Sequence, residues 1–127
     1  MTVAWARSVA HIQMPAGQNS TNRSDIEILY TGLPEPIDLD LDVDAGMLYW
    51  TDRGDDTINR GPIARRAREI LVTGVREAIG VAIDKARGRL YYTAAEGQLG
   101  RANLDGSAKQ ELTGAGAMTG IVIVSLP

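Results

Sequence analysis

An internal repeat of 42 residues constrains the fold of this chain more than any other feature. When residues 27–51 are shifted forward by 42 positions, they align with residues 69–93 without a gap. Chance does not give such agreement in an ungapped window, so the chain is built from a repeated structural unit. The identical pairs are Glu27/Glu69, Ile28/Ile70, Leu29/Leu71, Thr31/Thr73, Gly32/Gly74, Glu35/Glu77, Ile37/Ile79, Asp42/Asp84, Gly46/Gly88, Leu48/Leu90, Tyr49/Tyr91 and Thr51/Thr93.

The repeat extends, with small gaps, toward both ends of the chain. Residues 58–60 match residues 99–101, and both match residues 9–11. Near the C-terminus, residues 119–121 match residues 79–81. The chain of 127 residues is therefore interpreted as one domain, residues 1–127, made of three units. The units span about residues 1–45, 46–87 and 88–127.

Each unit has the pattern of short β-strands rather than helices. Residues 37–43 alternate apolar and acidic side chains, which is the period of a strand with two different faces. A turn at residues 44–46 follows, and further strands are expected at residues 47–51, 57–63 and 69–73. Four antiparallel strands in a unit of about 40–45 residues are typical of a propeller blade. The predicted fold class is all-β.

Two motifs carry a family resemblance. Residues 49–52 read Tyr-Trp-Thr-Asp, and residues 101–107 read Arg-Ala-Asn-Leu-Asp-Gly-Ser. With Leu48 and residues 58–60, they resemble the YWTD repeats of low-density lipoprotein receptor ectodomains. The first unit departs from the pattern, because residues 3–7 read Val-Ala-Trp-Ala-Arg where Leu-Tyr-Trp-Thr-Asp is expected.

A closer resemblance is to the C-terminal half of intracellular microbial and fungal YWTD-like propellers. It rests on residues 33–42 followed by residues 49–55 and Asn59-Arg60. Such proteins are often labelled dehydrogenases although they have no nucleotide motif. Some resemble cofactor-free hetero-Diels–Alderases of fungal tropolone–terpenoid pathways. The resemblance implies the fold and leaves the function open.

The number of strands predicts an assembly. With strands A to D counted from the innermost, the chain begins near Thr2 with a B strand and ends, over residues 118–125, with an unpaired A strand. Three blades are half of a six-bladed propeller, and an open half-ring exposes unpaired edges. We therefore expect three four-stranded blades, completed by homodimerisation with strand exchange between the N- and C-terminal blades. The alternative is a segment of a longer natural propeller.

Propeller ligands usually lie on the axis, at the face built by the D–A and B–C loops. Here these loops are residues 32–36, 75–78, 114–118, 52–56 and 94–98. They predict an acidic and moderately apolar pocket. The candidate catalytic residues are Glu35, Asp52 and Glu77. The candidate ligand-binding residues are Glu35, Pro36, Asp38, Trp50, Asp52, Arg53, Glu77, Glu96 and Met118.

Other chemistry is weakly supported. Asp38, Asp40, Asp42 and Asp44 share one face of a strand, but a strand holds them in a line rather than around an ion, so no metal site is expected. His11, the one histidine, occupies a structural repeat position. There is no dinucleotide or phosphate-binding glycine motif, so no cofactor is expected. The arginines at residues 65–68 are interpreted as a solvated turn.

The composition bounds the partners. A net charge of −3 gives no basic surface for nucleic acid or an anionic membrane. The absence of cysteine fits a reducing, cytoplasmic location. The predicted partners are a second copy of the chain and a small organic ligand. The function expected first is small-molecule binding on the axis of a dimeric ring. The alternatives are a cofactor-independent cyclase or isomerase of secondary metabolism, and a protein-interaction scaffold.

Overall fold

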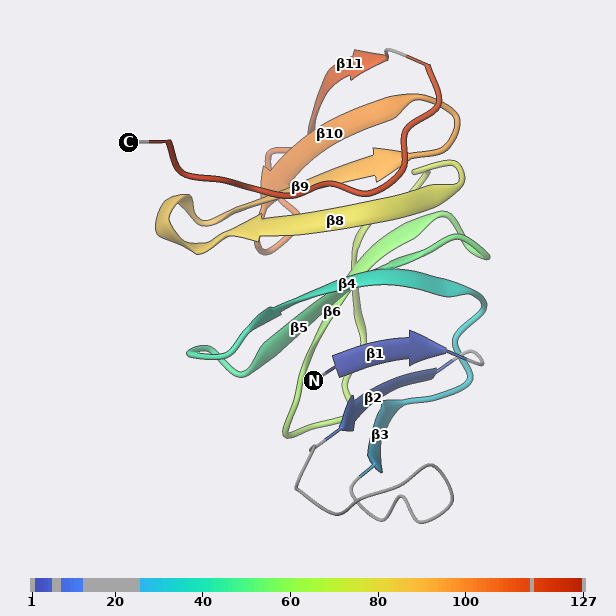
Figure 1. Ribbon diagram of the computed structural model, residues 1–127, viewed down its shortest axis with the longest axis vertical. Coiled ribbons are helices and arrows are strands. Elements are labelled where there is room, and N and C mark those ends of the chain that lie inside the picture. Colours follow the sequence, from blue (N-terminus) through green and yellow to red (C-terminus); the bar gives the residue numbers. More distant parts are fainter. Residues whose placement is uncertain (1, 6–7, 13–25, 115, 127) are drawn as a thin grey trace.

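The described residues form three antiparallel sheets. The computed structural model describes residues 2–5, 8–12, 26–114 and 116–126 (Figure 1). The N-terminal sheet contains β1 (Thr2–Trp5), β2 (Ser8–Ile12) and β3 (Ile26–Tyr30). The central sheet contains β4 (Pro36–Asp42), β5 (Met47–Asp52), β6 (Thr57–Pro62) and β7 (Glu69–Val72). The third sheet contains β8 (Ala78–Asp84), β9 (Arg89–Ala94), β10 (Gln98–Asn103) and β11 (Gln110–Gly114), with a short 3₁₀ turn, η1 (Lys85–Arg87), between β8 and β9.

Within each sheet the strands follow one another in sequence order, each paired antiparallel with the next. The all-β prediction is confirmed, and the strands of the central sheet lie within one or two residues of their predicted bounds. The three described strands of the N-terminal sheet agree with a chain that begins at a B strand. One feature differs from the prediction. Residues 118–125 form no strand, because a strand requires a hydrogen-bonded neighbour and no described segment pairs with them.

The core lies between the sheets. Because successive side chains of a strand point to opposite faces, Leu48 and Trp50 of β5 join one cluster while Tyr49 joins another. Trp50 packs against Tyr30 of the N-terminal sheet, with ring centroids 4.8 Å apart. Tyr49 belongs to the cluster that includes Tyr92 of the third sheet. One face of the central sheet therefore packs against the N-terminal sheet and the other face against the third sheet, so the sheets stack face to face.

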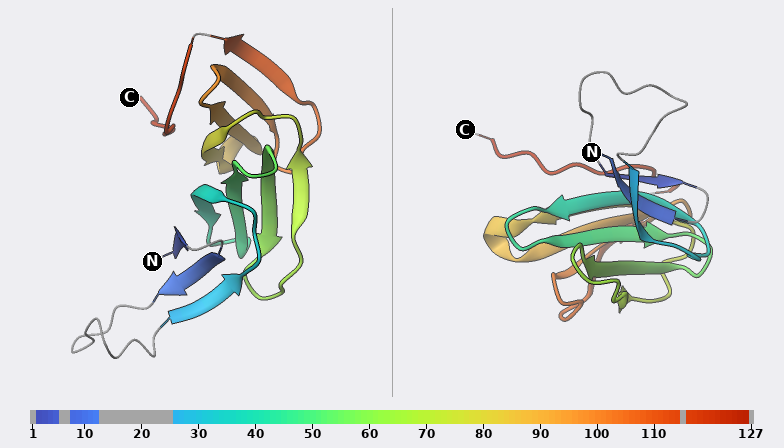
Figure 2. Two further views of the ribbon diagram at one scale, coloured as in Figure 1. Left: turned by 90° about the vertical axis from the view of Figure 1, so that its right-hand side faces the viewer. Right: turned by 90° about the horizontal axis from the view of Figure 1, so that it is seen from below.

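The stacked sheets form an arc, with the inner strands on its concave side. Figure 2 shows β1, β4 and β8 along this side, together with both ends of the chain. The C-terminal segment, defined here as residues 116–126, runs beside β8 (Figure 1). Thr93 donates a hydrogen bond to the Thr119 carbonyl. This repeats the bond of Thr51 to the Ile79 carbonyl of β8, at 3.0 Å, so the segment lies beside the third sheet as β8 lies beside the central sheet.

Candidate ligand-binding site

A groove of about 260 Å³ lies on the concave side of the arc. Three segments that run beside one another line it: residues 38–40 of β4, residues 81–83 of β8 and residues 121–123 of the C-terminal segment. The first two come from the innermost strands of adjacent sheets, and the third holds the same position one repeat later. We call it the axial groove. It combines apolar side chains with two carboxylates and exposed backbone.

The two carboxylates of the axial groove belong to Asp38 and Asp40, and they bridge neighbouring strands. Asp38 accepts from the N–H of Leu39 at 2.9 Å and from the N–H of Val81 at 3.1 Å. Asp40 accepts from Leu41 at 2.8 Å and from Ile83 at 2.9 Å. Each carboxylate thus satisfies one backbone N–H of its own strand and one of β8. These side chains hold β4 to β8 and keep a negative charge beside the groove.

Glu35 and Glu77, two candidate site residues, lie just before the inner strands β4 and β8, and Arg53 forms ion pairs with both. Arg53 contacts Glu35 at 2.8 Å and Glu77 at 3.4 Å. All three side chains are 42–47% exposed, so the pairs are solvated and contribute little to stability. Hydrogen bonding to Glu35 raises the pKa of Arg53. Glu77 adopts a φ of 57°, and the Asp56 carboxylate accepts from its N–H at 3.0 Å, which fixes this tight turn.

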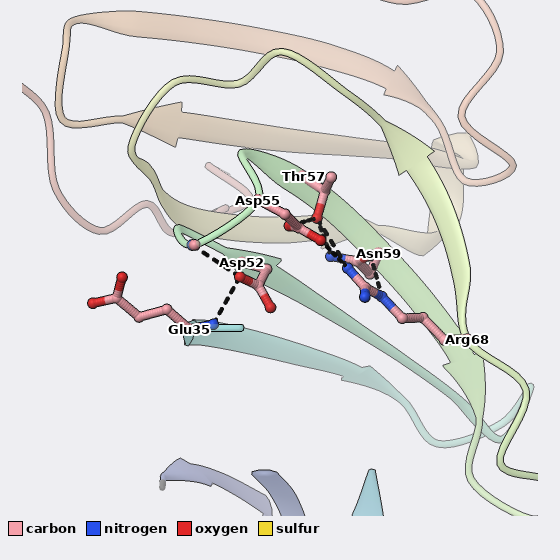
Figure 3. A network of polar contacts seen from close by, with 7 residues as sticks. Glu35, Asp52, Asp55, Thr57, Asn59 and Arg68 are labelled. Atoms are coloured by element: carbon pink, nitrogen blue, oxygen red, sulfur yellow. Dashed lines mark hydrogen bonds and ion pairs between the residues drawn. The ribbon is translucent and has the colours of Figure 1, made fainter. Parts of the chain in front are cut away.

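Asp52, a catalytic candidate, is completely buried. One carboxylate oxygen accepts from the N–H groups of Glu35 and Gly54, each at 2.9 Å (Figure 3). The other oxygen has no hydrogen-bond partner among the described residues. Burial raises the pKa of the Asp52 carboxyl above its ordinary value. The side chain therefore fastens the loop after β5 to the loop before β4, and a ligand on the surface does not reach it.

The other candidates lie in different places. Trp50 has no exposed surface and belongs to the core, so it does not line the groove. Pro36 begins β4 and Met118 lies in the C-terminal segment, both half-buried. Glu96 pairs with Arg76 at 3.0 Å. That pair borders a separate hollow of about 270 Å³ near β10 and β11, which shares no lining residue with the axial groove.

Sequence reasoning missed one polar network. Arg68 donates to Asn59 and Asp55, each at 2.8 Å, and to Thr57 at 3.2 Å (Figure 3). Arg66 pairs with Glu27 at 2.8 Å, and both of these side chains are exposed. The interpretation of residues 65–68 as a solvated turn is therefore wrong for Arg68. No local sequence pattern predicts this network, because its members are up to 13 residues apart and come into contact only when β6 and β7 pair.

The described residues hold neither a metal-binding cluster nor a membrane-spanning helix. Among the described residues, no group of three or more His, Cys, Asp or Glu side chains is arranged to hold a metal ion. Asp44 is exposed and pairs with Lys85 at 3.4 Å. His11 lies in β2, but its side chain is outside what the structure describes. No helix in the described ranges is long and apolar enough to cross a membrane.

Comparisons with known proteins bear on the family. No protein-family model matches the chain. Over 41 residues it is 56% identical to "Low-density lipoprotein receptor-related protein 1" of Pyricularia oryzae, which is 32% of this chain and 13% of that protein. The crystal structure of a nidogen/laminin complex contains a chain with a TM-score of 0.76 and 22% identity, over 89% of this chain and 43% of that one. The matched sequence and the matched fold support a YWTD-type β-propeller.

A second curated relative extends the match among fungi. Over 55 residues, the YWTD-type chain is 44% identical to a "3-hydroxyacyl-CoA dehydrogenase-like protein" of Cochliobolus heterostrophus, which is 40% of this chain and 12% of that protein. The YWTD-type chain therefore spans about an eighth of the length of the curated relatives it matches. The resemblance to cofactor-free hetero-Diels–Alderases stays a prediction.

Proposed function

We propose that this YWTD-type chain binds a small organic molecule in the axial groove of a six-bladed ring made of two copies. The observation that supports the proposal most is the position of the C-terminal segment. It lies beside the third sheet as an inner strand, with Thr93 bonded to the Thr119 carbonyl, and it forms one wall of the groove. In a ring, this segment is the innermost strand of the next blade.

Exposed apolar side chains on the C-terminal segment support the pairing of two copies. Val122 and Val124 are 78% and 69% exposed. A monomer rarely exposes such surfaces without a partner. The occupant we propose for this segment is the N-terminal sheet of a second copy.

The repeat predicts the register of this pairing. Ala82 of β8 pairs with Tyr91 of β9. Val122 is the repeat equivalent of Ala82. In the N-terminal sheet, Thr2 pairs with His11 as Tyr91 pairs with Arg101 in the third sheet, so Thr2 stands where the repeat has Tyr91. Val122 of one copy is therefore expected opposite Thr2 of the other, in an antiparallel ladder that gives the N-terminal sheet its fourth strand.

Cysteine cross-linking tests this register directly, because the natural chain contains no cysteine. A Thr2→Cys chain mixed with a Val122→Cys chain is expected to form a disulfide-linked heterodimer under mild oxidation. Ile70→Cys, an exposed position on the outer strand β7, replaces Thr2→Cys in the control mixture. Equal cross-linking in both mixtures, or none in either, would contradict the strand exchange.

Binding in the groove needs a separate test. A library of small organic fragments is added to the ¹⁵N-labelled chain, and the amide resonances that move are mapped. The proposal expects shifts at residues 38–40, 81–83 and 121–123, which line the axial groove. Shifts confined to the hollow near β10 and β11 would place the ligand elsewhere. Failure of every fragment to move a groove amide would contradict small-molecule binding there.

A further inference from the structure

Two backbone N–H groups in the axial groove have no side-chain acceptor, whereas their equivalents one repeat earlier do. Between β4 and β8, the carboxylates of Asp38 and Asp40 accept from the N–H groups of Val81 and Ile83. One repeat later, the corresponding donors are the N–H groups of Ile121 and Ile123. The residues equivalent to the two aspartates are Gly80 and Ala82. Neither has a side chain that accepts a hydrogen bond.

The C-terminal segment is nevertheless close enough to β8 for the same arrangement. A Cβ atom placed on Gly80 would lie 3.1 Å from the Ile121 nitrogen. Ala82, Ile121 and Ile123 all line the axial groove. In the described part of the chain, neither of the two N–H groups has a hydrogen-bond partner. Backbone donors at a sheltered surface are normally paired, so these two are available to a bound molecule.

We infer that the ligand of the axial groove carries two oxygen acceptors, which take the places filled one repeat earlier by the Asp38 and Asp40 carboxylates. The inference rests on the proposed small-molecule function and specifies how that site recognises its ligand. Because the two donors are two residues apart in an extended segment, the acceptors are expected about 7 Å apart. A molecule with carbonyl oxygens at both ends of a short carbon chain meets this requirement.

The charge around the groove selects a neutral ligand. Asp38 and Asp40 line the same groove as the free N–H groups, and both are negative. The two cations of the turn after β8 are engaged elsewhere: Lys85 contacts Asp42 at 3.8 Å and Asp44 at 3.4 Å, and Arg87 contacts Asp84 at 2.9 Å. A ligand carboxylate entering beside Asp38 and Asp40 would therefore be repelled by like charge. Ketone, ester or amide oxygens accept the same hydrogen bonds without this repulsion.

A matched pair of probes tests both parts of the inference on the ¹⁵N-labelled wild-type chain. 2,5-Hexanedione and succinate both have two methylene groups between their oxygen-bearing carbons, and they differ in charge. The dione is expected to shift the amide resonances of Ile121 and Ile123, and succinate at the same concentration to shift them at least fivefold less. Larger shifts with succinate would overturn the neutral class. No shift at either amide with either probe would overturn the acceptor site.

A substitution that supplies the missing acceptor tests the geometry independently. In Ala82→Asp, the new carboxylate is expected to reach the Ile123 N–H as Asp40 reaches Ile83, slowing exchange of that amide hydrogen at least tenfold. It should also abolish the effect of the dione at Ile123. Ala82→Leu has a similar volume without an acceptor and should leave the exchange rate unchanged. Equal slowing in both variants would mean that burial, not an acceptor, protects the amide.

Small-molecule binding in the groove and the two-acceptor site at Ile121 and Ile123 are contradicted by different results. If fragments move the amides of residues 81–83 while Ile121 and Ile123 stay unmoved, small molecules bind in the groove and the acceptor site is wrong. If no fragment moves any groove amide, the proposed function itself fails. Should Ala82→Asp not fold, the wild-type titration still decides the acceptor site.

Discussion

At the scale of single residues, the repeat is held together by a threonine hydroxyl. The Thr51 hydroxyl accepts from the N–H of Asp38 and donates to the carbonyl of Ile79, each at 3.0 Å. One buried side chain of β5 thus joins its own sheet to the inner strand of the next. Thr93 is its repeat equivalent and holds the C-terminal segment. The identity of Thr51 and Thr93 in the repeat is explained by this shared role.

Removal of the Thr51 hydroxyl should therefore destabilise the fold. Thr51→Val keeps the shape but leaves the N–H of Asp38 and the carbonyl of Ile79 without their partner. The expected loss is about 1–3 kcal/mol in the free energy of unfolding, measured by urea denaturation. Thr73→Val, at an exposed position, is the matched control and should change it by less than about 0.5 kcal/mol. Equal effects of both substitutions would contradict the bridging role.

The buried Asp52 carboxyl predicts a pH dependence. Burial raises its pKa in the folded state, so the folded protein binds the proton more tightly than the unfolded chain does. Stability from this group is therefore present at low pH and falls as pH rises from the ordinary value of 3.8 through the raised pKa. Asn at this position keeps an oxygen for the two N–H donors and does not titrate.

Comparison of urea midpoints for wild type and Asp52→Asn between pH 4 and pH 7 measures this effect. The urea midpoint of the variant minus that of wild type should increase as pH rises. A difference that is constant with pH, or that moves in favour of wild type, would show that the folded-state pKa is not raised.

At the scale of elements, two arginines of similar appearance in the sequence have different roles. Arg53 joins two loops through solvated ion pairs with Glu35 and Glu77. Arg68 precedes β7 and donates to Asn59, which is completely buried in β6. Loss of Arg68 leaves a buried acceptor unpaired, whereas loss of Arg53 leaves carboxylates that water can solvate. The difference in cost follows from burial and not from the number of contacts.

Substitution of each arginine by methionine measures this difference. Arg68→Met is expected to lower the free energy of unfolding by about 1–3 kcal/mol. Arg53→Met should lower it by no more than about 1 kcal/mol. Chemical denaturation of the two variants side by side is sufficient. A larger loss of unfolding free energy for Arg53→Met than for Arg68→Met would contradict the structural role assigned to Arg68.

The strands could be predicted from the sequence because the repeat and the two-residue alternation are local. The burial of Trp50 could not be predicted in this way. The motif identifies the residue, but its side chain is buried because the N-terminal sheet covers that face of β5. The contact of Arg53 with both Glu35 and Glu77 depends on the spacing of two sheets, which no local pattern contains. The free N–H of Ile121 depends on the missing side chain of Gly80, far away in the sequence.

At the scale of the whole molecule, the arc has two ends with complementary needs. Among the described residues, the N-terminal sheet has three strands, and the C-terminal segment is extended without a strand partner. Exposed valines on the C-terminal segment supply an apolar surface for contact. In the proposed dimer, two copies related by a two-fold axis satisfy both ends at once, because each contributes to the other the strand that it lacks.

A charge placed on the C-terminal segment should weaken this assembly. Val122→Asp puts a carboxylate on the exposed apolar side of the segment, where burial in the dimer is costly. The dimer dissociation constant is expected to rise at least tenfold in sedimentation experiments. Ile70→Asp, at an exposed position of the outer strand β7, should leave it unchanged. An equal effect of the two variants would contradict the proposed interface.

Solution mass tests the account most directly. Light scattering of the natural chain at several concentrations should give about twice the mass of one chain, 13.6 kDa, and this value should persist on dilution. That result supports a ring completed by two copies and an axial groove shared between them. A folded monomer of 13.6 kDa at every concentration would contradict the ring and, with it, the pairing of the C-terminal segment with β1.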